Sequence, residues 1–545
     1  GPWGHRERNR QTITMGVYKL LNNFETMLSS IQVGAVTLLR RGGESGTSFD
    51  LDAVKRAGHG AIVRIIQRHA NLSKAVCTSQ SGVYKWLTDA SNTQRPEDHI
   101  EVRAMDPEDD VAGPEGVPVD GAWLKYFNGR LQDNSTQTYG APPWGITVLV
   151  GQRQLACMVF YNHSIGDGMS GMILSHDFLS LLSEELTSPQ EPLLPTPPPM
   201  SPPPSLLTLL RPSLASRFLV QAIVGATQLT IWVCRSLNLQ MPAFFSSHFL
   251  PSTLRPNTSL CPLAYSGGTQ RTMAYRGKNA NHDALLKECR KRGCTIGGVG
   301  LAALMFAGTS VESRLAKEGG QAGGLASKFP VQITYDINWR GRVEPDPGAS
   351  VGPLICADDC KVNVDTLAPS AAADPQAGLW ALAGACSSQM KAKLKGGRRG
   401  TSGFSALISE AMVNPLFPLR DMMPLDFDVN LSNIGRWPFE RTSFQGVGRL
   451  TDVFTGSSSA EGRGGGMGMI VYLSCAAGHL SYSASYHETY MTEGYASAIL
   501  ESVVDVVEGG LLSAAGGDAS WREFDRKWGA RLGAAVPEVE VEFAR

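Results

Sequence analysis

Residues 145–168 read GITVLVGQRQLACMVFYNHSIGDG, and they carry the clearest structural signals in the sequence. Two apolar runs flank a turn at residues 151–153, which predicts a pair of antiparallel strands. The second run is apolar throughout, as in a strand that is covered on both faces in the middle of a sheet. A polar loop follows it. The next apolar residues then recur at helical intervals, at Met172, Leu179, Leu182 and Leu186.

Outward from this stretch, helix and strand patterns are mixed along the chain without a regular βαβ series. Asp50 is placed to cap a helix over 51–72, and Thr295 is placed to cap a long apolar helix. Further elements are expected as strands at 271–277 and 328–340, a strand pair at 467–487, and helices at 281–293, around 402–415 and from about residue 492, while the segment DFDVNLSNIGRW at 426–437 is left without an assigned element. The order predicts an α/β fold with mixed sheets rather than a Rossmann fold.

The chain is long enough for more than one lobe. It has 545 residues, which exceeds what one hydrophobic core usually holds. Nine prolines between 188 and 204 exclude a helix or a central strand there and predict an extended connector. We therefore expect an N-terminal lobe at 1–187, a proline-rich crossover with an apolar helix at 188–256, and a C-terminal lobe at 257–545.

Charge and cysteine content exclude several classes of protein. Lys and Arg number 49 and Asp and Glu 50, so the net charge of −1 offers no general attraction for nucleic acid. The ten cysteines show neither CxxC spacing nor a companion His pair, so reduced thiols are expected and no metal site. The polar start GPWGHRERNRQ does not resemble a signal peptide. We therefore expect a monomer in the cytoplasm.

An apolar run at 218–234 raises the question of membrane contact. It is 17 residues long, whereas a spanning helix needs about 20 residues. Gln221, Gln228 and Arg235 also argue against a span and indicate a buried or interfacial helix. Peripheral contact with an endomembrane through this run stays open.

The sequence His163-Ser-Ile-Gly-Asp167-Gly168 is the main candidate for chemistry. A His that follows a buried strand has a rigid support, and an Asp four residues later can brace the loop around it. Imidazole titrates close to neutral pH, which suits a general base. The alternative interpretation is a structural loop histidine beside a turn aspartate.

Other motifs lack the context that their chemistry needs. Residues 348–352 match GxSxG, but EPDP precedes them and Pro353 follows, so the strand and helix of a serine hydrolase elbow are missing. The glycine-rich segment 462–468 lacks a P-loop Lys, and no HExxH or EF-hand pattern occurs.

Three pieces together resemble a known superfamily. HxxxDG after a strand, Arg340 at the end of VQITYDINWR and the late NLSNIG segment are similar to the CoA-dependent acyltransferases. These include chloramphenicol acetyltransferase, plant BAHD enzymes, condensation domains and wax-ester synthases. The opening at 3–8, and Leu286-Lys-x-Cys-Arg290 leading into a Thr-initiated helix, most resemble the fungal alcohol acetyltransferase family.

The resemblance implies two chloramphenicol acetyltransferase-like lobes with mixed sheets flanked by helices, and a tunnel at their interface. His163 would deprotonate an alcohol or amine that attacks the thioester of acetyl-CoA or another short acyl-CoA. Asp167 would be structural and pair with Arg340, with Gly168 supporting the loop. Ser432 or Asn433 would donate to the oxyanion or to CoA. The alternative for Arg340 is a strand-end charge, and for Asn433 a turn residue.

Two motifs of this sequence differ from those of the relatives. A basic cluster has two possible interpretations, a CoA-phosphate site or a solvated surface. Asn162 precedes His163 where several relatives have a second His, and the DFGWG of plant members is absent. A cluster near the middle of the second half could bind CoA phosphates, although such runs are more often solvated. Its members are Lys391, Lys393, Lys395, Arg398 and Arg399.

The sequence therefore predicts an enzyme of secondary metabolism that acetylates a hydroxyl of a small apolar acceptor. Two alternatives stay open. One is a condensation-type enzyme that takes acyl groups from a carrier protein. The other is a family member that binds a ligand without catalysis.

Overall fold

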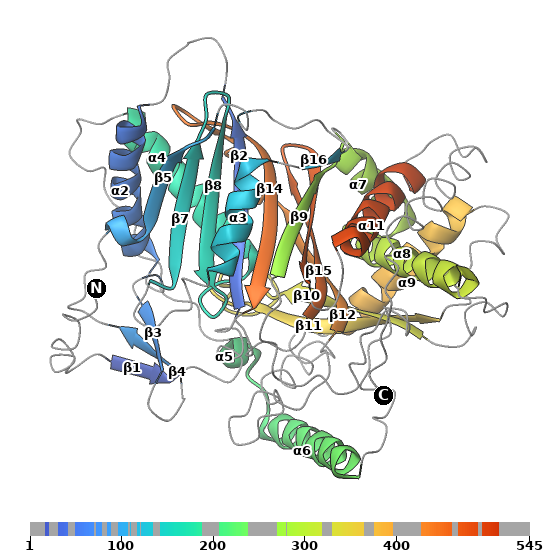
Figure 1. Cartoon of the computed structure of the whole chain (residues 1–545). Coiled ribbons are helices and arrows are strands. Elements are labelled where there is room, and N and C mark those ends of the chain that lie inside the picture. Colours follow the sequence, from blue (N-terminus) through green and yellow to red (C-terminus); the bar gives the residue numbers. More distant parts are fainter. Residues whose placement is uncertain are drawn as a thin grey trace, which may run out of the picture.

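In the computed structural model the described residues form two central sheets with helices on their outer sides (Figure 1). The structure describes residues 17–20, 31–41, 50–69, 72, 74–78, 84–88, 96–106, 110, 117–119, 121–133, 142–187, 206–237, 270–278, 281–318, 330–363, 375–395, 427–459, 467–488 and 493–511. The predicted helix around 402–415 and the proline-rich segment 188–204 lie outside them.

The first sheet has six strands and contains the predicted hairpin. Its strands, in spatial order, are β13 Ser443–Phe444, β14 Gly448–Ser459, β2 Ile31–Arg40, β8 Gln154–Asn162, β7 Trp144–Val150 and β5 Ile100–Ala104. β7 and β8 pair antiparallel from Trp144 opposite Tyr161 to Val150 opposite Leu155. Every residue of β8 is buried, which confirms the central strand predicted from its apolar run.

The second sheet has seven strands. In spatial order they are β11 Ile355–Asn363, β10 Pro330–Asn338, β12 Phe427–Arg436, β15 Met467–Ala476, β16 His479–His487, β9 Gln270–Arg276 and β6 Val117–Pro118. β12 runs parallel to β10 and β15, whereas β16 pairs antiparallel with β15 and β9, so the sheet is mixed as predicted. A small separate sheet contains β1 Val17–Leu20, β4 Tyr84–Thr88 and β3 Lys74–Thr78.

Helices flank both sheets, except α6, which lies apart from them (Figure 1). The described helices are α2 Leu51–Arg68, α3 Ala122–Gln132, α4 Gly168–Thr187, α5 Leu206–Leu210, α6 Leu214–Ser236, α7 Asn281–Arg292, α8 Ile296–Glu318, α9 Pro375–Leu394 and α11 Glu493–Val504, with short helical segments at Pro96–Asp98 and Asp505–Gly510. α2 and α4 pack together on the first sheet, and α8, α9 and α11 cover the second (Figure 1). Both predicted caps are present: Asp50 accepts from the N–H of Asp52, and Thr295 Oγ1 from that of Gly298.

Strand β14 joins the two halves of the chain. It comes from residues 448–459 yet pairs with β2 in the first sheet, from Arg449 opposite Arg40 to Ser459 opposite Ile31. The sequence pattern did not predict β14 or β2. The divisions at 1–187, 188–256 and 257–545 stay a prediction, and they place this strand in the opposite lobe from its sheet.

Polar side chains connect β14 to the second sheet. Ser457 Oγ lies 2.6 Å from the Tyr472 hydroxyl, and Ser483 Oγ donates to the Thr455 carbonyl at 2.6 Å. Arg276 of β9 makes a two-pronged contact with Asp452 of β14 at 3.0 and 2.5 Å. Both ions are buried and the guanidinium fork matches the carboxylate, so this pair is a specific contact between the two sheets.

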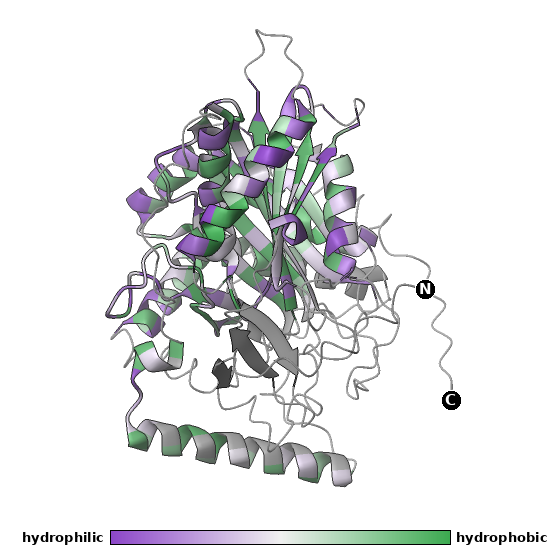
Figure 2. Ribbon diagram, turned by 90° about the vertical axis from the view of Figure 1, so that its left-hand side faces the viewer, coloured by the Kyte–Doolittle hydropathy of each residue, from purple (hydrophilic) through white to green (hydrophobic). Residues whose placement is uncertain are grey.

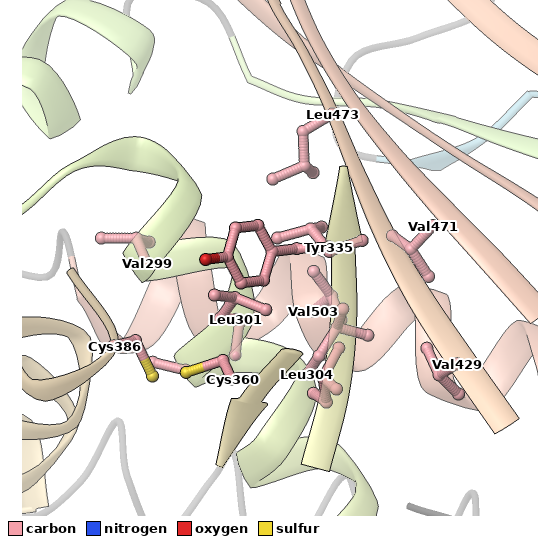
Figure 3. Packing of buried hydrophobic residues seen from close by; sticks show 14 of the residues in the cluster. Val299, Leu301, Leu304, Tyr335, Cys360, Cys386, Val429, Val471, Leu473 and Val503 are labelled. Carbon is pink, nitrogen blue, oxygen red and sulfur yellow. The ribbon is translucent and has the colours of Figure 1, made fainter. Parts of the chain in front are cut away.

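Alternation along the second sheet separates an apolar face from a polar one. Figure 3 shows Tyr335 of β10 with Val429, Val471 and Leu473 of β12 and β15, packed near Leu301 of α8. Successive side chains of a strand point to opposite faces. The intervening even-numbered residues therefore face the first sheet, namely Asp336, Asn430, Ser432 and Tyr472.

Candidate active site

His163 lies directly after the buried strand β8, in a loop that holds its ring. Its backbone N–H donates to the Ile31 carbonyl at 2.8 Å, and its Nδ1 lies 2.8 Å from the Gly166 carbonyl oxygen. A carbonyl can only accept, so in the neutral ring Nδ1 carries the hydrogen and Nε2 keeps its lone pair. The side chain is half-buried. This is the tautomer that a general base acting through Nε2 needs.

Asp167 is buried and turned away from solvent by four hydrogen bonds. Its Oδ1 accepts from the N–H and hydroxyl of Ser170, both at 2.9 Å, as in a helix N-cap of α4. Its Oδ2 accepts from Arg340 Nη1 at 2.6 Å and from the Leu354 N–H at 2.9 Å. Burial alone would raise the pKa of this carboxyl, but Arg340 and the hydrogen bonds outweigh burial and lower the pKa. The carboxylate is therefore ionised and structural.

Arg340 reaches this carboxylate from the far sheet, just after β10. The Nη2 group donates to the Ser350 and Gly352 carbonyls, each at 3.1 Å, and to Ser170 Oγ at 3.1 Å. The two residues paired by the resemblance are thus in contact, while their part in catalysis stays a prediction. The GxSxG segment 348–352, dismissed as a hydrolase elbow, supplies backbone acceptors to this brace. Sequence reasoning missed that role because carbonyl groups leave no residue signature.

Gly168 lies at a close approach between the two sheets. A Cβ at this position would lie 2.3 Å from Cδ1 of Ile434, which belongs to β12 of the second sheet. The absent side chain lets the His163 loop approach that strand.

Ser432 and Asn433 are adjacent on β12 and face opposite sides of the sheet. Ser432 is hydrogen-bonded to Asp336 on the polar face. The Asn433 amide nitrogen lies 3.4 Å from where a Cβ of Gly297 would be, at the start of α8 on the helix-covered face. Of these two candidates for the oxyanion donor, only Ser432 lies on the face toward the first sheet.

Asp336 is a candidate site residue that sequence reasoning did not single out. Its Oδ1 accepts from Asn430 Nδ2 at 3.2 Å, and Ser432 also hydrogen-bonds to it. Burial raises the pKa of this carboxyl above its ordinary value; these hydrogen bonds and the charge of a protonated His163 offset only part of that rise, and the charge of Asp167 adds to it. Asp336 and His163 are therefore close enough to interact electrostatically. An even–odd count along the predicted strand would have placed Asp336 opposite the apolar face.

The basic cluster proposed for CoA phosphates is largely engaged at the end of α9. Lys393 pairs with Asp358 at 2.5 Å, and Lys391 donates to the Gly293 carbonyl at 2.6 Å. Lys395 is exposed, whereas Arg398 and Arg399 lie outside the described residues. Among the described members, Lys391 and Lys395 are both exposed.

Metal ligands and membrane spans were also sought within the ranges given above. No group of three or more His, Cys, Asp or Glu side chains in them is arranged to hold a metal ion. Eight of the nine cysteines within these ranges are free thiols, all except Cys77, of whose side chain nothing is described. None of the helices described is long and apolar enough to cross a bilayer.

The chain matches no protein-family model and no curated protein sequence. Its fold is similar to that of solved structures. The trichothecene 15-O-acetyltransferase TRI3 from Fusarium sporotrichioides has a TM-score of 0.63 at 11% identity, covering 91% of this chain and 96% of that one. The first condensation domain of the calcium-dependent antibiotic synthetase has a TM-score of 0.53 at 11% identity, covering 92% and 98%.

A third similar structure is the condensation domain from the monacolin K polyketide synthase MokA, with a TM-score of 0.51 at 12% identity, covering 92% of this chain and 98% of that one. Likeness at such identities shows the fold alone. The two-lobed α/β fold predicted from the sequence is confirmed, and it is one that acetyltransferases and condensation domains share.

Proposed function

We propose that this protein is an acyl-CoA-dependent acyltransferase that moves an acetyl or other short acyl group to a hydroxyl of a small apolar acceptor. The observation that carries the proposal is the His163 ring, fixed by the Gly166 carbonyl so that Nε2 is the basic nitrogen. The named 15-O-acetyltransferase among the similar folds supports a hydroxyl acceptor. Membership of the fungal alcohol acetyltransferase family is part of this proposal, as is a tunnel between the lobes.

In the proposed reaction His163 takes up one proton from the acceptor and later gives it to the leaving group. His163 Nε2 accepts the acceptor's hydroxyl proton while the oxygen attacks the thioester carbonyl carbon, and a tetrahedral oxyanion forms. The C–S bond then breaks, the carbonyl re-forms as an ester, and the imidazolium returns the proton to the CoA sulfur. A positioned base contributes about 10²- to 10⁴-fold to such a step.

Two groups of the second sheet complete the proposed site. In its ionised form, Asp336 would favour the positive charge that His163 gains in the transition state. Ser432, on the same polar face, is the candidate donor to the oxyanion, and its single hydroxyl hydrogen would turn from Asp336 to the substrate oxygen for that role. Asp167 and Arg340 hold the loop and touch no substrate, so they are positioning residues.

The first test is His163→Ala, assayed by free thiol release from acetyl-CoA with a panel of small alcohols and by product mass. The wild-type chain should release CoA and form an ester, and the variant should lose about 10³-fold or more in turnover. His59→Ala, an exposed histidine on α2, is the matched control and should keep full activity. Near-full turnover in the His163 variant would contradict the role of His163 as the general base. Turnover only with an acyl-loaded carrier protein would favour the condensation-type alternative.

The second test separates Asp336 from a merely structural residue. Asp336→Asn should reduce turnover by up to about tenfold, because the imidazolium that forms in the transition state loses a nearby negative charge. An unchanged turnover per folded molecule, with only a lower melting temperature, would contradict the electrostatic role.

A further inference from the structure

Helix α6 exposes large apolar side chains that a folded protein normally covers. Phe218 is 77% exposed and Leu214 76%, and Leu229 and Trp232 are 61% and 59% exposed. Leu219, Ile223 and Leu237 are also among the exposed large apolar residues. Single exposed apolar residues are ordinary, whereas a contiguous group marks an interaction surface.

Four of these residues, Leu214, Phe218, Leu229 and Trp232, belong to one continuous stripe, which we call the α6 stripe. Positions 214, 218, 222, 225, 229, 232 and 236 follow each other at intervals of three or four, so they share one helix face, and all seven are exposed. They are Leu, Phe, Ala, Gly, Leu, Trp and Ser. The helix has 23 residues and is therefore about 35 Å long. The stripe contains no charged residue along this length.

The position of α6 leaves the stripe open to a large partner. In Figures 1 and 2 the helix lies apart from both sheets and from the helices that cover them, at the lower edge of the molecule. Apolar residues recur along it in Figure 2. A flat surface could contact its whole length at once.

The charge of the surrounding sequence indicates which kind of surface fits. Residues 192–282 contain no Asp or Glu, although the whole chain has 50 of them in 545 residues. The same segment contains seven cations, at Arg211, Arg217, Arg235, Arg255, Arg271, Arg276 and Lys278. Arg271 and Arg276 are paired with Glu488 and Asp452, so the cations that could meet a lipid surface are among the other five. Arg211, directly before the helix, is exposed. An apolar stripe within an acid-free, basic segment matches an anionic lipid surface.

We propose that α6 lies flat on an anionic membrane surface, with the α6 stripe in the boundary between headgroups and acyl chains. Phe218 and Trp232 near its two ends would anchor it, since aromatic rings favour that boundary. The helix does not qualify as a span. A second copy of the chain fits less well, because two acid-free segments would face each other with like charges. The proposal does not depend on acyl transfer.

The test is co-sedimentation of the full chain with vesicles of phosphatidylcholine alone and of phosphatidylcholine with phosphatidylserine. The chain should bind the anionic vesicles, and added salt should weaken binding. Phe218→Ser/Leu229→Ser/Trp232→Ser should lower the bound fraction by about tenfold or more, because each change removes apolar area from the contact. Ser236→Ala, on the same face, should bind like the wild type.

Circular dichroism and the acetylation assay report whether the triple variant stays folded. If it does not, Trp232→Ser alone replaces it, with a smaller loss of binding expected. Absence of binding to either vesicle would overturn the proposal, and so would binding that these substitutions leave unchanged. A dimer in sedimentation velocity that the substitutions dissolve, without vesicle binding, would assign the stripe to a second copy.

Discussion

Asp167 and Asp177 are both buried carboxylates associated with α4, and they serve different parts of the molecule. Asp177 lies 2.8 Å from His69 Nε2 and 3.2 Å from Arg68 Nε, both at the end of α2. Asp167 instead contacts Arg340 from the other sheet. One carboxylate therefore holds two helices together within a lobe, and the other connects two lobes beside His163.

The difference lies in which partner each carboxylate has. Burial alone would raise the pKa of Asp177, but hydrogen bonds from His176 and His69 and the charge of Arg68 lower it to about 2. Arg340 remains a cation at all accessible pH, so the Asp167 pair keeps its geometry wherever Asp167 is ionised. Burial with a lowered pKa is common to both sites and does not by itself identify a catalytic centre. What distinguishes Asp167 from Asp177 is its position beside His163.

The largest effect is expected from Asp167→Asn. The change leaves the Arg340 guanidinium buried without its anion, which should lower the free energy of unfolding by about 3 to 5 kcal/mol. The loosened loop should also reduce turnover by about 10²-fold in molecules that remain folded. Urea denaturation and CoA release measure the two effects. Unchanged stability and turnover in Asp167→Asn would contradict the role of Asp167 in holding the His163 loop.

Arg340→Lys should have the next largest effect. Lysine keeps the charge but cannot contact Asp167, Ser170 and the Ser350 and Gly352 carbonyls at once. We expect a loss of about 2 kcal/mol in stability and about tenfold in turnover. Arg342→Lys, an exposed neighbour, is the control. If Arg340→Lys had the same stability and turnover as Arg342→Lys, a positive charge at position 340 would be enough to hold Asp167, and the guanidinium hydrogen bonds would not matter.

Asp177→Asn should affect stability without affecting turnover. Removing the charge weakens the contacts with His69 and Arg68 and should cost about 2 kcal/mol. Turnover per folded molecule should stay at the wild-type value, because none of these residues lies in the proposed site. A lower turnover in fully folded Asp177→Asn would contradict the view that Asp177 serves stability alone while Asp167 also serves the site.

The smallest effect is the acid dependence of stability. The pKa of Asp177 is lowered from 3.8 to about 2, so its stabilisation is complete above about pH 4 and is lost as the pH falls toward 2. Between pH 5 and pH 3 the wild type should lose about 1 kcal/mol more than Asp177→Asn. Urea midpoints at the two pH values measure this. Parallel pH dependence in both proteins would contradict the assignment.

Local sequence predicted the elements that carry their own signal. The β7–β8 hairpin, the Asp50 and Thr295 caps and the helix after Gly168 follow from apolar periodicity and from capping residues a few positions away. The same signals could not place β14, because strand pairing depends on partners hundreds of residues away. Its serines look like a loop in sequence and are hydrogen-bonded between the sheets in the fold.

By itself, the sequence determined the mixed α/β class, the strand that supports His163 and the carboxylate that follows it. These depend on contacts within a few residues, which composition and spacing record. Only the tertiary structure decided that Asp336 and Ser432 face the first sheet while Asn433 faces α8, and that backbone carbonyls near Ser350 hold Arg340. Those choices depend on strand register and on the packing of two sheets, and neither has a signature in any single segment.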